Sequence, residues 1–340
     1  MIDLNKYICI RPWTHIEIHC IGNELVIYPC CPSWIKSSYG NIKDISDLNI
    51  INTSNAKKFR ETVLNGEYNK CKTEICPYIQ EYNPVITKDR KDIKVEDLRL
   101  SFIHLCYDRT CNLRCPSCRT QMEMLTEKTN PILYKNVINF QEKLLNFVNT
   151  YEYPLTIGVE GSGDPFASPL IFNLLQKFDG KNKNLTFHFQ SNGILFDEEH
   201  WKKLYKIYNP KNVAMISIDA GNEETYNKTR VGGNWNKLLK NLDFIKKLKD
   251  NNELEWVGLC FVVQYNNYKS IPQFIELCEK LQFDPLFTRI LNWKTFTNEE
   301  YKLHDICNVN HPNHKDYLSI INNIKDKNIK SIKINWGNIT

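Results

Sequence analysis

Three cysteines in one short stretch, Cys111, Cys115 and Cys118, are the residues of this sequence best suited to chemistry. Three and then two residues separate them, which is too crowded for helical or strand positions that face one way. The spacing instead suits a loop whose sulfurs converge on one inorganic centre. Iron–sulfur clusters are usually held by four thiolates, so three leave one iron without a protein ligand. An open metal position of this kind is where a reactant can bind.

The C-x3-C-x2-C spacing, together with the preceding Tyr107-Asp-Arg-Thr, resembles the signature of the radical SAM enzymes. In that family the three cysteines hold a [4Fe–4S] cluster, and the open iron binds S-adenosylmethionine (SAM). The resemblance implies that one electron cleaves SAM to methionine and a 5′-deoxyadenosyl radical, which takes a hydrogen atom from a substrate. It also implies an electron donor of the flavodoxin or ferredoxin type. A zinc knuckle is the alternative for such closely spaced thiols.

Six further cysteines lie before residue 97, in a segment too small and irregular to build a large core, so a metal would help to stabilise it. The segment, residues 1–96, resembles the SPASM/twitch modules of radical SAM proteins, which bind auxiliary Fe–S clusters; the one-cluster version is favoured. The ligands that the resemblance implies for an auxiliary [4Fe–4S] cluster are Cys9, Cys30, Cys71 and Cys76. Cys31 is the alternative to Cys30, Cys20 is expected to be a buried apolar residue, and a structural zinc site with the same ligands is an open alternative.

The elements that must position the Cys111 loop follow a regular order from about residue 97. Helical segments alternate with β-rich runs at 100–108, 155–160, 185–191, 213–219, 255–264 and 286–292. This order predicts parallel strands with right-handed crossovers. We therefore predict an α/β fold with three parts: the cysteine-rich α+β module at 1–96, a partial (β/α)6 barrel at 97–292 that matches the radical SAM fold, and a C-terminal cap at 293–340.

Polar residues alternate with apolar ones along several of these strands, so one face of each strand can line a ligand-holding lumen. The polar residues nearest the carboxyl ends, where barrel enzymes place their sites, are Asp108, Glu160, Gln190, Asp219 and Gln264. The run Ser162-Gly163-Asp164-Pro165 resembles the GGEP motif that holds the SAM amino group. The resemblance further implies SAM contacts from Ser191, Asn192, Ser217, Asp219, Arg230 and Gln264.

Cys260 shares its strand face with Gln264, so its thiol could donate a hydrogen atom to a substrate radical, as an epimerase would need. The auxiliary cluster favours oxidation, and the slightly preferred substrate is a peptide or protein. The alternative is a radical SAM dehydrogenase or epimerase that acts on a sugar, an aminocyclitol or a glycan precursor. A non-enzymatic alternative is a zinc-binding protein that recognises a partner.

The composition argues against nucleic-acid binding, a membrane span and secretion. The net charge of +5 over 340 residues is small, and no arginine-rich or aromatic-interleaved stripe indicates nucleic acid. The apolar runs are too short for a membrane span. The first residues have no basic-then-apolar signal pattern, so thirteen cysteines indicate metal-bound thiols in a reducing cytoplasm rather than disulfides.

Overall fold

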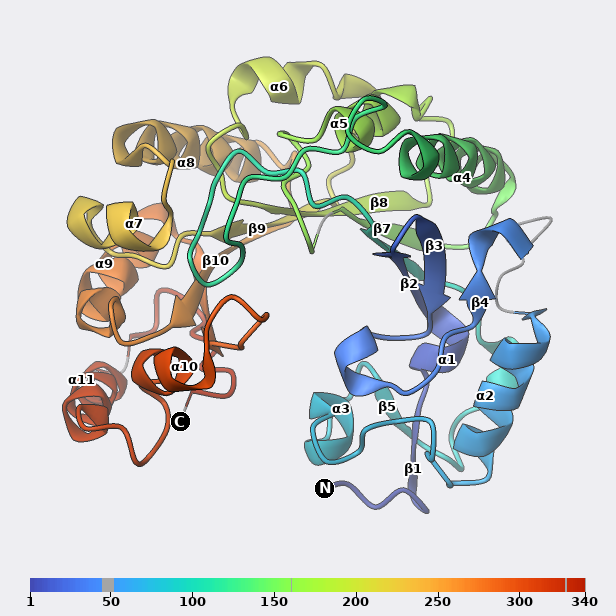
Figure 1. Ribbon diagram of the computed structural model, residues 1–340, viewed down its shortest axis with the longest axis horizontal. Helices are drawn as coiled ribbons and strands as arrows, with labels where there is room; N and C mark the ends of the chain where they lie inside the picture. The colour runs from blue at the N-terminus through green and yellow to red at the C-terminus, as the bar shows by residue number, and fades with distance from the viewer. Residues whose placement is uncertain (45–51, 160, 328, 340) are drawn as a thin grey trace. The chain divides into compact units, whose positions relative to one another are not determined.

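The computed structural model describes residues 1–44, 52–159, 161–327 and 329–339, so Glu160 lies outside the described residues. The chain forms two compact units (Figure 1). The first unit comprises Met1–Arg109, Leu125–Ser162 and Asn173–Phe187, and the second comprises Thr110–Met124, Gly163–Phe172 and His188–Thr340. Within the described ranges, no helix is both long and apolar enough to span a lipid bilayer.

In the larger sheet, the first unit contributes β4 (Gly40–Asn41), β3 (Glu24–Tyr28), β2 (His15–Ile21), β6 (Phe102–Cys106) and β7 (Leu155–Val159), in that order. Strands β2 and β3 form an antiparallel hairpin, whereas β2 pairs with β6 and β6 with β7 in parallel. The hairpin turn uses Gly22 at φ 60°, a backbone conformation that glycine adopts without strain. The cysteine-rich N-terminal segment therefore contributes a strand directly beside the first strand predicted for the barrel.

The rest of the first unit consists of short elements and one long helix. Asn130 caps α4 (Pro131–Thr150) by accepting a hydrogen bond from the Leu133 N–H, and Thr53 caps α2 (Ser54–Leu64) in the same way through Ala56. The other elements are β1 (Tyr7–Cys9), α1 (Arg11–Thr14), η1 (Pro32–Trp34), η2 (Ile42–Asp44), α3 (Pro77–Gln80), β5 (Thr87–Asp89) and η4 (Val95–Asp97). Strands β1 and β5 pair as a separate antiparallel ribbon, which places Cys9 opposite Thr87.

The strands of the second unit are parallel and are connected through helices (Figure 1). They are β8 (Leu185–Ser191), which begins in the first unit, β9 (Val213–Ser217), β10 (Trp256–Val263) and β11 (Asp284–Arg289). The helices are α5 (Pro169–Lys177), which ends in the first unit, α6 (Glu198–Lys202), η5 (Tyr205–Ile207), α7 (Glu223–Thr229), α8 (Trp235–Asp250), η6 (Tyr268–Ser270), α9 (Ile271–Leu281), α10 (Asn298–His304) and α11 (His314–Asp326). The predicted α/β order is confirmed from β6 to β11. The last strand begins earlier than predicted because its ladder with β10 starts at Asp284.

The predicted two-faced character of the strands is clearest in β8. Leu185, Phe187, Phe189 and Ser191 are buried, whereas the alternating Thr186, His188 and Gln190 are only partly buried. Because strand side chains alternate between faces, the polar set shares the more open face. This alternation brings polar side chains to one side of the strand.

Candidate functional site

The three cysteines of the predicted cluster lie in a loop of the second unit, where backbone groups approach their sulfurs. The Leu113 N–H donates to Cys111 Sγ at 3.4 Å, and a tight turn joins the Cys118 N–H to the Cys115 carbonyl at 2.9 Å. Burial raises the pKa of the Cys111 thiol to about 11 and also raises the pKa of Cys115. These thiols must therefore lose protons when a metal binds.

Asp164 fixes the end of β8 rather than presenting a free carboxylate. Its Oδ2 accepts hydrogen bonds from the Ser191 hydroxyl at 2.9 Å and from the Asn192 N–H at 2.7 Å. Its Oδ1 accepts from the Phe166 N–H at 3.1 Å, and its backbone N–H donates to the Thr110 carbonyl. The Asp164 side chain is fully buried, and this burial raises its pKa although the hydrogen bonds oppose the change. These hydrogen bonds indicate that Asp164 holds the carboxyl end of β8 in place.

Asn192 connects the end of β8 to the cysteine loop. Its Nδ2 donates to Asn112 Oδ1 at 2.8 Å and lies 3.7 Å from Cys111 Sγ, within reach of a weak N–H···S hydrogen bond. Its Oδ1 accepts from the Ile194 N–H, which fixes the amide orientation. Next to it, Gly193 has φ +80°, and a Cβ there would lie 2.8 Å from Leu238 Cδ1. The turn therefore requires glycine and sets the position of Asn192.

Asp219 and Arg230 form a buried ion pair beside the cysteine loop. Arg230 Nη2 lies 2.7 Å from Asp219 Oδ2, with 12% and 2% of their side chains exposed, and Arg230 Nη1 is 3.7 Å from Cys115 Sγ. Burial alone would lower the pKa of Arg230, but Asp219 and Cys115 raise it above the usual arginine value. Asp219 has φ 56°, and its Oδ1 accepts from the Val262 N–H. A left-handed aspartate is costly, and such positions often occur at functional sites.

The other predicted contact residues occupy different places. Gly163, Pro165, Ser217, Cys260 and Gln264 belong to the second unit, whereas Ser162 belongs to the first. The Ser162 hydroxyl donates to the Cys106 carbonyl at 3.1 Å, and Ser217 pairs with Cys260 across β9 and β10. The Cys260 carbonyl accepts from the Asp219 N–H at 3.3 Å, so this thiol lies on the strand beside the ion pair. Burial raises the pKa of Cys260 to about 12, so it is a protonated thiol at neutral pH.

Sequence reasoning missed two polar residues of the cysteine loop. Arg119 is nearly buried, and its Nη2 donates to Cys118 Sγ at 3.5 Å. Asn112 Oδ1 accepts a hydrogen bond from Asn192 Nδ2. The signal was present, since an arginine directly after the third cysteine places a cation beside the thiolates. Hydrogen bonds and charge at the sulfurs tune the potential of a cluster.

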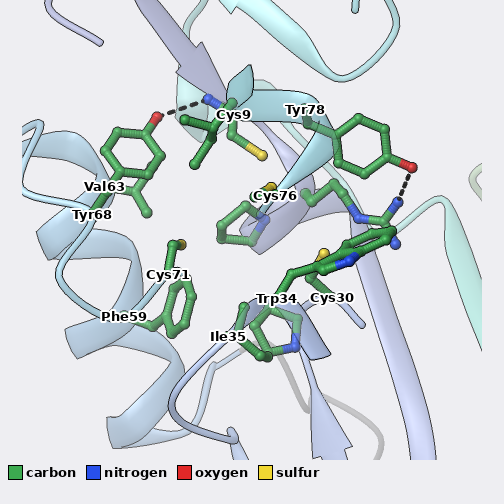
Figure 2. Close-up of a pocket in the computed structure, with 14 residues that line it drawn as sticks. Cys9, Cys30, Trp34, Ile35, Phe59, Val63, Tyr68, Cys71, Cys76 and Tyr78 are labelled. Carbon is green, nitrogen blue, oxygen red and sulfur yellow. Dashed lines mark hydrogen bonds between the residues drawn. The ribbon is translucent and has the colours of Figure 1, made fainter. Parts of the chain in front are cut away.

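The four predicted auxiliary ligands line one pocket of the first unit (Figure 2). Cys9, Cys30, Cys71 and Cys76 surround it together with Arg11, Trp34, Tyr68 and Tyr78. In the described part of the chain, Cys31 is not among the lining residues. Burial raises the pKa of Cys9 to about 11 and that of Cys71 to about 12. Cys20 lies near the Gly22 turn, where its Sγ donates to the Gly22 carbonyl; the expectation that it is buried is wrong because the hairpin end leaves it partly exposed.

Arg11 gives this pocket a buried cation. Its Nη1 donates to the Tyr78 hydroxyl and its Nη2 to Glu17 Oε1 at 3.1 Å, whereas its buried Nε has no hydrogen-bond partner among the described residues. An unmatched buried donor is costly unless a ligand accepts from it. Four thiols around a cationic donor fit an anionic iron–sulfur cluster, which the Arg11 guanidinium would stabilise.

Models of two protein families match this sequence. The model for the radical SAM superfamily matches residues 107–278, just over half of the chain. The chain belongs to the radical SAM superfamily. The model for the SPASM iron–sulfur cluster-binding domain matches residues 9–77. Iron–sulfur clusters and SAM are the cofactors of these domains, and the partial radical SAM barrel is confirmed.

Several solved structures are similar to the chain. Native anSMEcpe with bound AdoMet is 17% identical, with a TM-score of 0.47, and the match covers 69% of this chain and 63% of that one. SuiB of Streptococcus suis bound to S-adenosylmethionine is 12% identical, with a TM-score of 0.44 and coverage of 83% and 60%. The chain thus spans about three fifths of the length of these structures. A search of curated proteins returned no significant match.

Two buried hydrogen-bond donors near the cysteine loop are available to a bound SAM or cluster. The buried Arg230 Nε and the buried Tyr226 hydroxyl have no hydrogen-bond partner in the part of the chain that the structure describes. Both belong to the second unit with the three cysteines, and Arg230 also lies near Cys115 Sγ. A bound carboxylate or cluster sulfur would satisfy such donors.

Proposed function

We propose that Cys111, Cys115 and Cys118 hold the SAM-binding [4Fe–4S] cluster. The observation that carries this proposal is that the arginines Arg119 and Arg230 and the Asn192 amide all lie at the sulfurs of one loop. These donors would stabilise the negative charge of a cluster bound to three thiolates. When bound, the cluster and SAM supply a 5′-deoxyadenosyl radical that removes a hydrogen atom from the substrate.

The surrounding strand ends would hold SAM in place. Asp219 keeps the Arg230 guanidinium in position for the SAM carboxylate, while Gly163 and Pro165 shape the backbone turn proposed for the amino group. Asp164 supports this turn indirectly by fixing Ser191 and Asn192. Ser217 and Gln264 of the second unit complete the proposed set of contacts. A donor of the flavodoxin or ferredoxin type would supply the electron.

The auxiliary pocket supports an oxidoreductase-like reaction. We assign Cys9, Cys30, Cys71 and Cys76 as ligands of a second [4Fe–4S] cluster, because they line one pocket with the buried Arg11 cation. A second redox centre can accept the electron that a substrate radical loses on oxidation. The substrate class we propose is a peptide or protein, which undergoes maturation, oxidation or epimerisation. In the epimerisation case, the protonated Cys260 thiol would return a hydrogen atom to the substrate.

Isotope transfer tests the substrate class. The iron-loaded enzyme is incubated with SAM, a reductant and either a perdeuterated peptide fraction or a perdeuterated carbohydrate fraction from cells. The proposal predicts that 5′-deoxyadenosine gains one deuterium with the peptide fraction, because the abstracted atom ends in this product. Deuterium from the carbohydrate fraction alone would instead establish the sugar alternative. The Cys115→Ala variant serves as the control and should form no deuterated 5′-deoxyadenosine with either fraction.

A further inference from the structure

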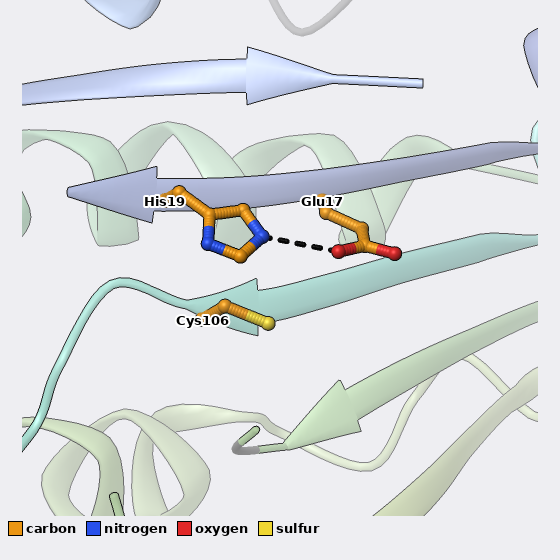
Figure 3. Close-up of side chains that lie close together, drawn as sticks. All are labelled: Glu17, His19 and Cys106. Atoms are coloured by element: carbon orange, nitrogen blue, oxygen red, sulfur yellow. Dashed lines mark hydrogen bonds and ion pairs between the residues drawn. The ribbon is translucent and has the colours of Figure 1, made fainter. Parts of the chain in front are cut away.

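Three potential metal ligands of different chemistry converge on the face shared by β2 and β6, outside the four-cysteine pocket. The parallel ladder pairs Glu17 with His104 and His19 with Cys106. Figure 3 shows Glu17 and His19 on one strand and Cys106 on its neighbour. His19 Nε2 lies 3.0 Å from Glu17 Oε2, and with Cys106 Sγ the ligand atoms all lie within 4.8 Å of one another.

These separations are close to those of a metal site. Zinc–ligand bonds of about 2.0 Å to nitrogen and oxygen and about 2.3 Å to sulfur place tetrahedral ligand atoms roughly 3.2 to 3.7 Å apart. The Glu17–His19 separation of 3.0 Å needs to open only slightly. Cys106 and Glu17 are buried, whereas 22% of the His19 side chain is exposed, which leaves an entry side for an ion.

The carboxylate of Glu17 is already oriented by residues behind it. Its Oε1 accepts from Arg11 Nη2 at 3.1 Å and lies 3.1 Å from His15 Nε2, so Oε2 is the oxygen directed toward His19. Partners of this kind, which hold a ligand through its second atom, are typical of metal sites.

A glycine keeps space free beside the third ligand. A Cβ at Gly161 would lie 3.3 Å from Cys106 Sγ and 3.2 Å from His104 Cε1, closer than most Cβ contacts. A larger residue at this position would therefore crowd the sulfur. Three protein ligands leave a fourth coordination position for water or another small ligand.

We propose that Glu17, His19 and Cys106 form a zinc site with one open coordination position. The mixed oxygen, nitrogen and sulfur set suits this borderline metal. Binding forms one Zn–S bond and releases the thiol proton of Cys106 to solvent, so the carboxylate, the thiolate and the dication together are neutral. The site is distinct from the auxiliary pocket, although Arg11 contacts both the pocket and Glu17.

Zinc binding to the iron-loaded protein tests the proposal. Competition with a chromophoric chelator gives the zinc affinity, and zinc K-edge absorption reports the ligands. We expect one sulfur with nitrogen and oxygen neighbours in the wild type. The dissociation constant should rise at least tenfold in His19→Ala and in Cys106→Ser. Cys20→Ser is the matched control, because Cys20 adjoins His19 but bonds the Gly22 carbonyl, and its affinity should be unchanged.

Iron content and SAM binding, measured on each variant, show whether it is folded. Absence of zinc binding by the folded wild-type protein would overturn the proposal. So would an affinity that is unchanged in both folded variants, or four sulfur neighbours, which would assign the zinc to the four-cysteine pocket. The absorption measurement needs no variant, so the proposal can be tested even if a substitution prevents folding.

Discussion

Replacing Asp219 by asparagine should destabilise the protein strongly, because it leaves the Arg230 cation buried without its partner. The two side chains are 2% and 12% exposed and lie 2.7 Å apart. Charges about 4 Å apart attract by about 4 kcal/mol at an effective dielectric constant near 20. Removing one partner of such a pair typically costs about 3–5 kcal/mol. We expect a loss of this size in the free energy of unfolding.

The Asp219→Asn substitution removes the negative charge and leaves the size of the side chain almost unchanged. Asparagine keeps an oxygen for the Val262 N–H and tolerates the left-handed φ of 56°. Anaerobic urea denaturation of the iron-loaded protein, followed by tryptophan fluorescence, compares it with Glu224→Gln. The Glu224–Lys228 pair has the same 2.7 Å separation, but 82% and 57% of its side chains are exposed. That control should not change stability measurably, because solvent screens exposed pairs.

A double variant tests whether the unfavourable effect comes from the Arg230 cation that loses its partner. Combining Asp219→Asn with Arg230→Met removes the stranded cation and should recover part of the lost stability. The reasoning would be refuted if Asp219→Asn alone cost less than about 1 kcal/mol, since removing one partner of a buried ion pair typically costs about 3–5 kcal/mol.

Three further results are expected. Arg119→Gln removes a cation beside Cys118 and should make the cluster potential more negative in EPR-monitored redox titration; an unchanged potential would contradict a role for this contact. Burial raises the pKa of Cys111 and of Cys9 to about 11, so Co²⁺ should bind the metal-free protein more tightly at pH 8 than at pH 6.5, with proton release; equal affinities would indicate that the thiols are already ionised at pH 6.5. If the reaction is an epimerisation, Cys260→Ala should abolish deuterium incorporation from D₂O into the product, and unchanged incorporation would exclude Cys260 as the hydrogen donor.

Local spacing predicted the parts of the structure that depend on short-range pattern. The cysteine spacing selected the loop, and the alternation of β-rich runs with helical segments located β6 to β11. Cys9, Cys30, Cys71 and Cys76 were chosen by resemblance, and the structure brings them to one pocket. Whether they are ligands remains a prediction.

Long-range strand pairing was beyond sequence reasoning. A one-residue change of register reverses every side chain of a strand, so the pairing of His19 with Cys106 could not be inferred from local pattern. The hydrogen bonds of Asp164 could not be predicted for a related reason, because its partners Ser191 and Asn192 lie at and just after the end of the following strand. In both cases the contact depends on how distant segments fold together.

Reductive cleavage of SAM is the most direct test of the central claim. The protein is purified anaerobically, its iron, sulfide and zinc are counted, and 5′-deoxyadenosine is measured after addition of dithionite and SAM. We predict about eight irons per chain, as two four-iron clusters require, and 5′-deoxyadenosine formation that is lost in Cys115→Ala. Zinc without iron, and no SAM cleavage, would contradict the assignment of the Cys111 loop as the radical-generating site.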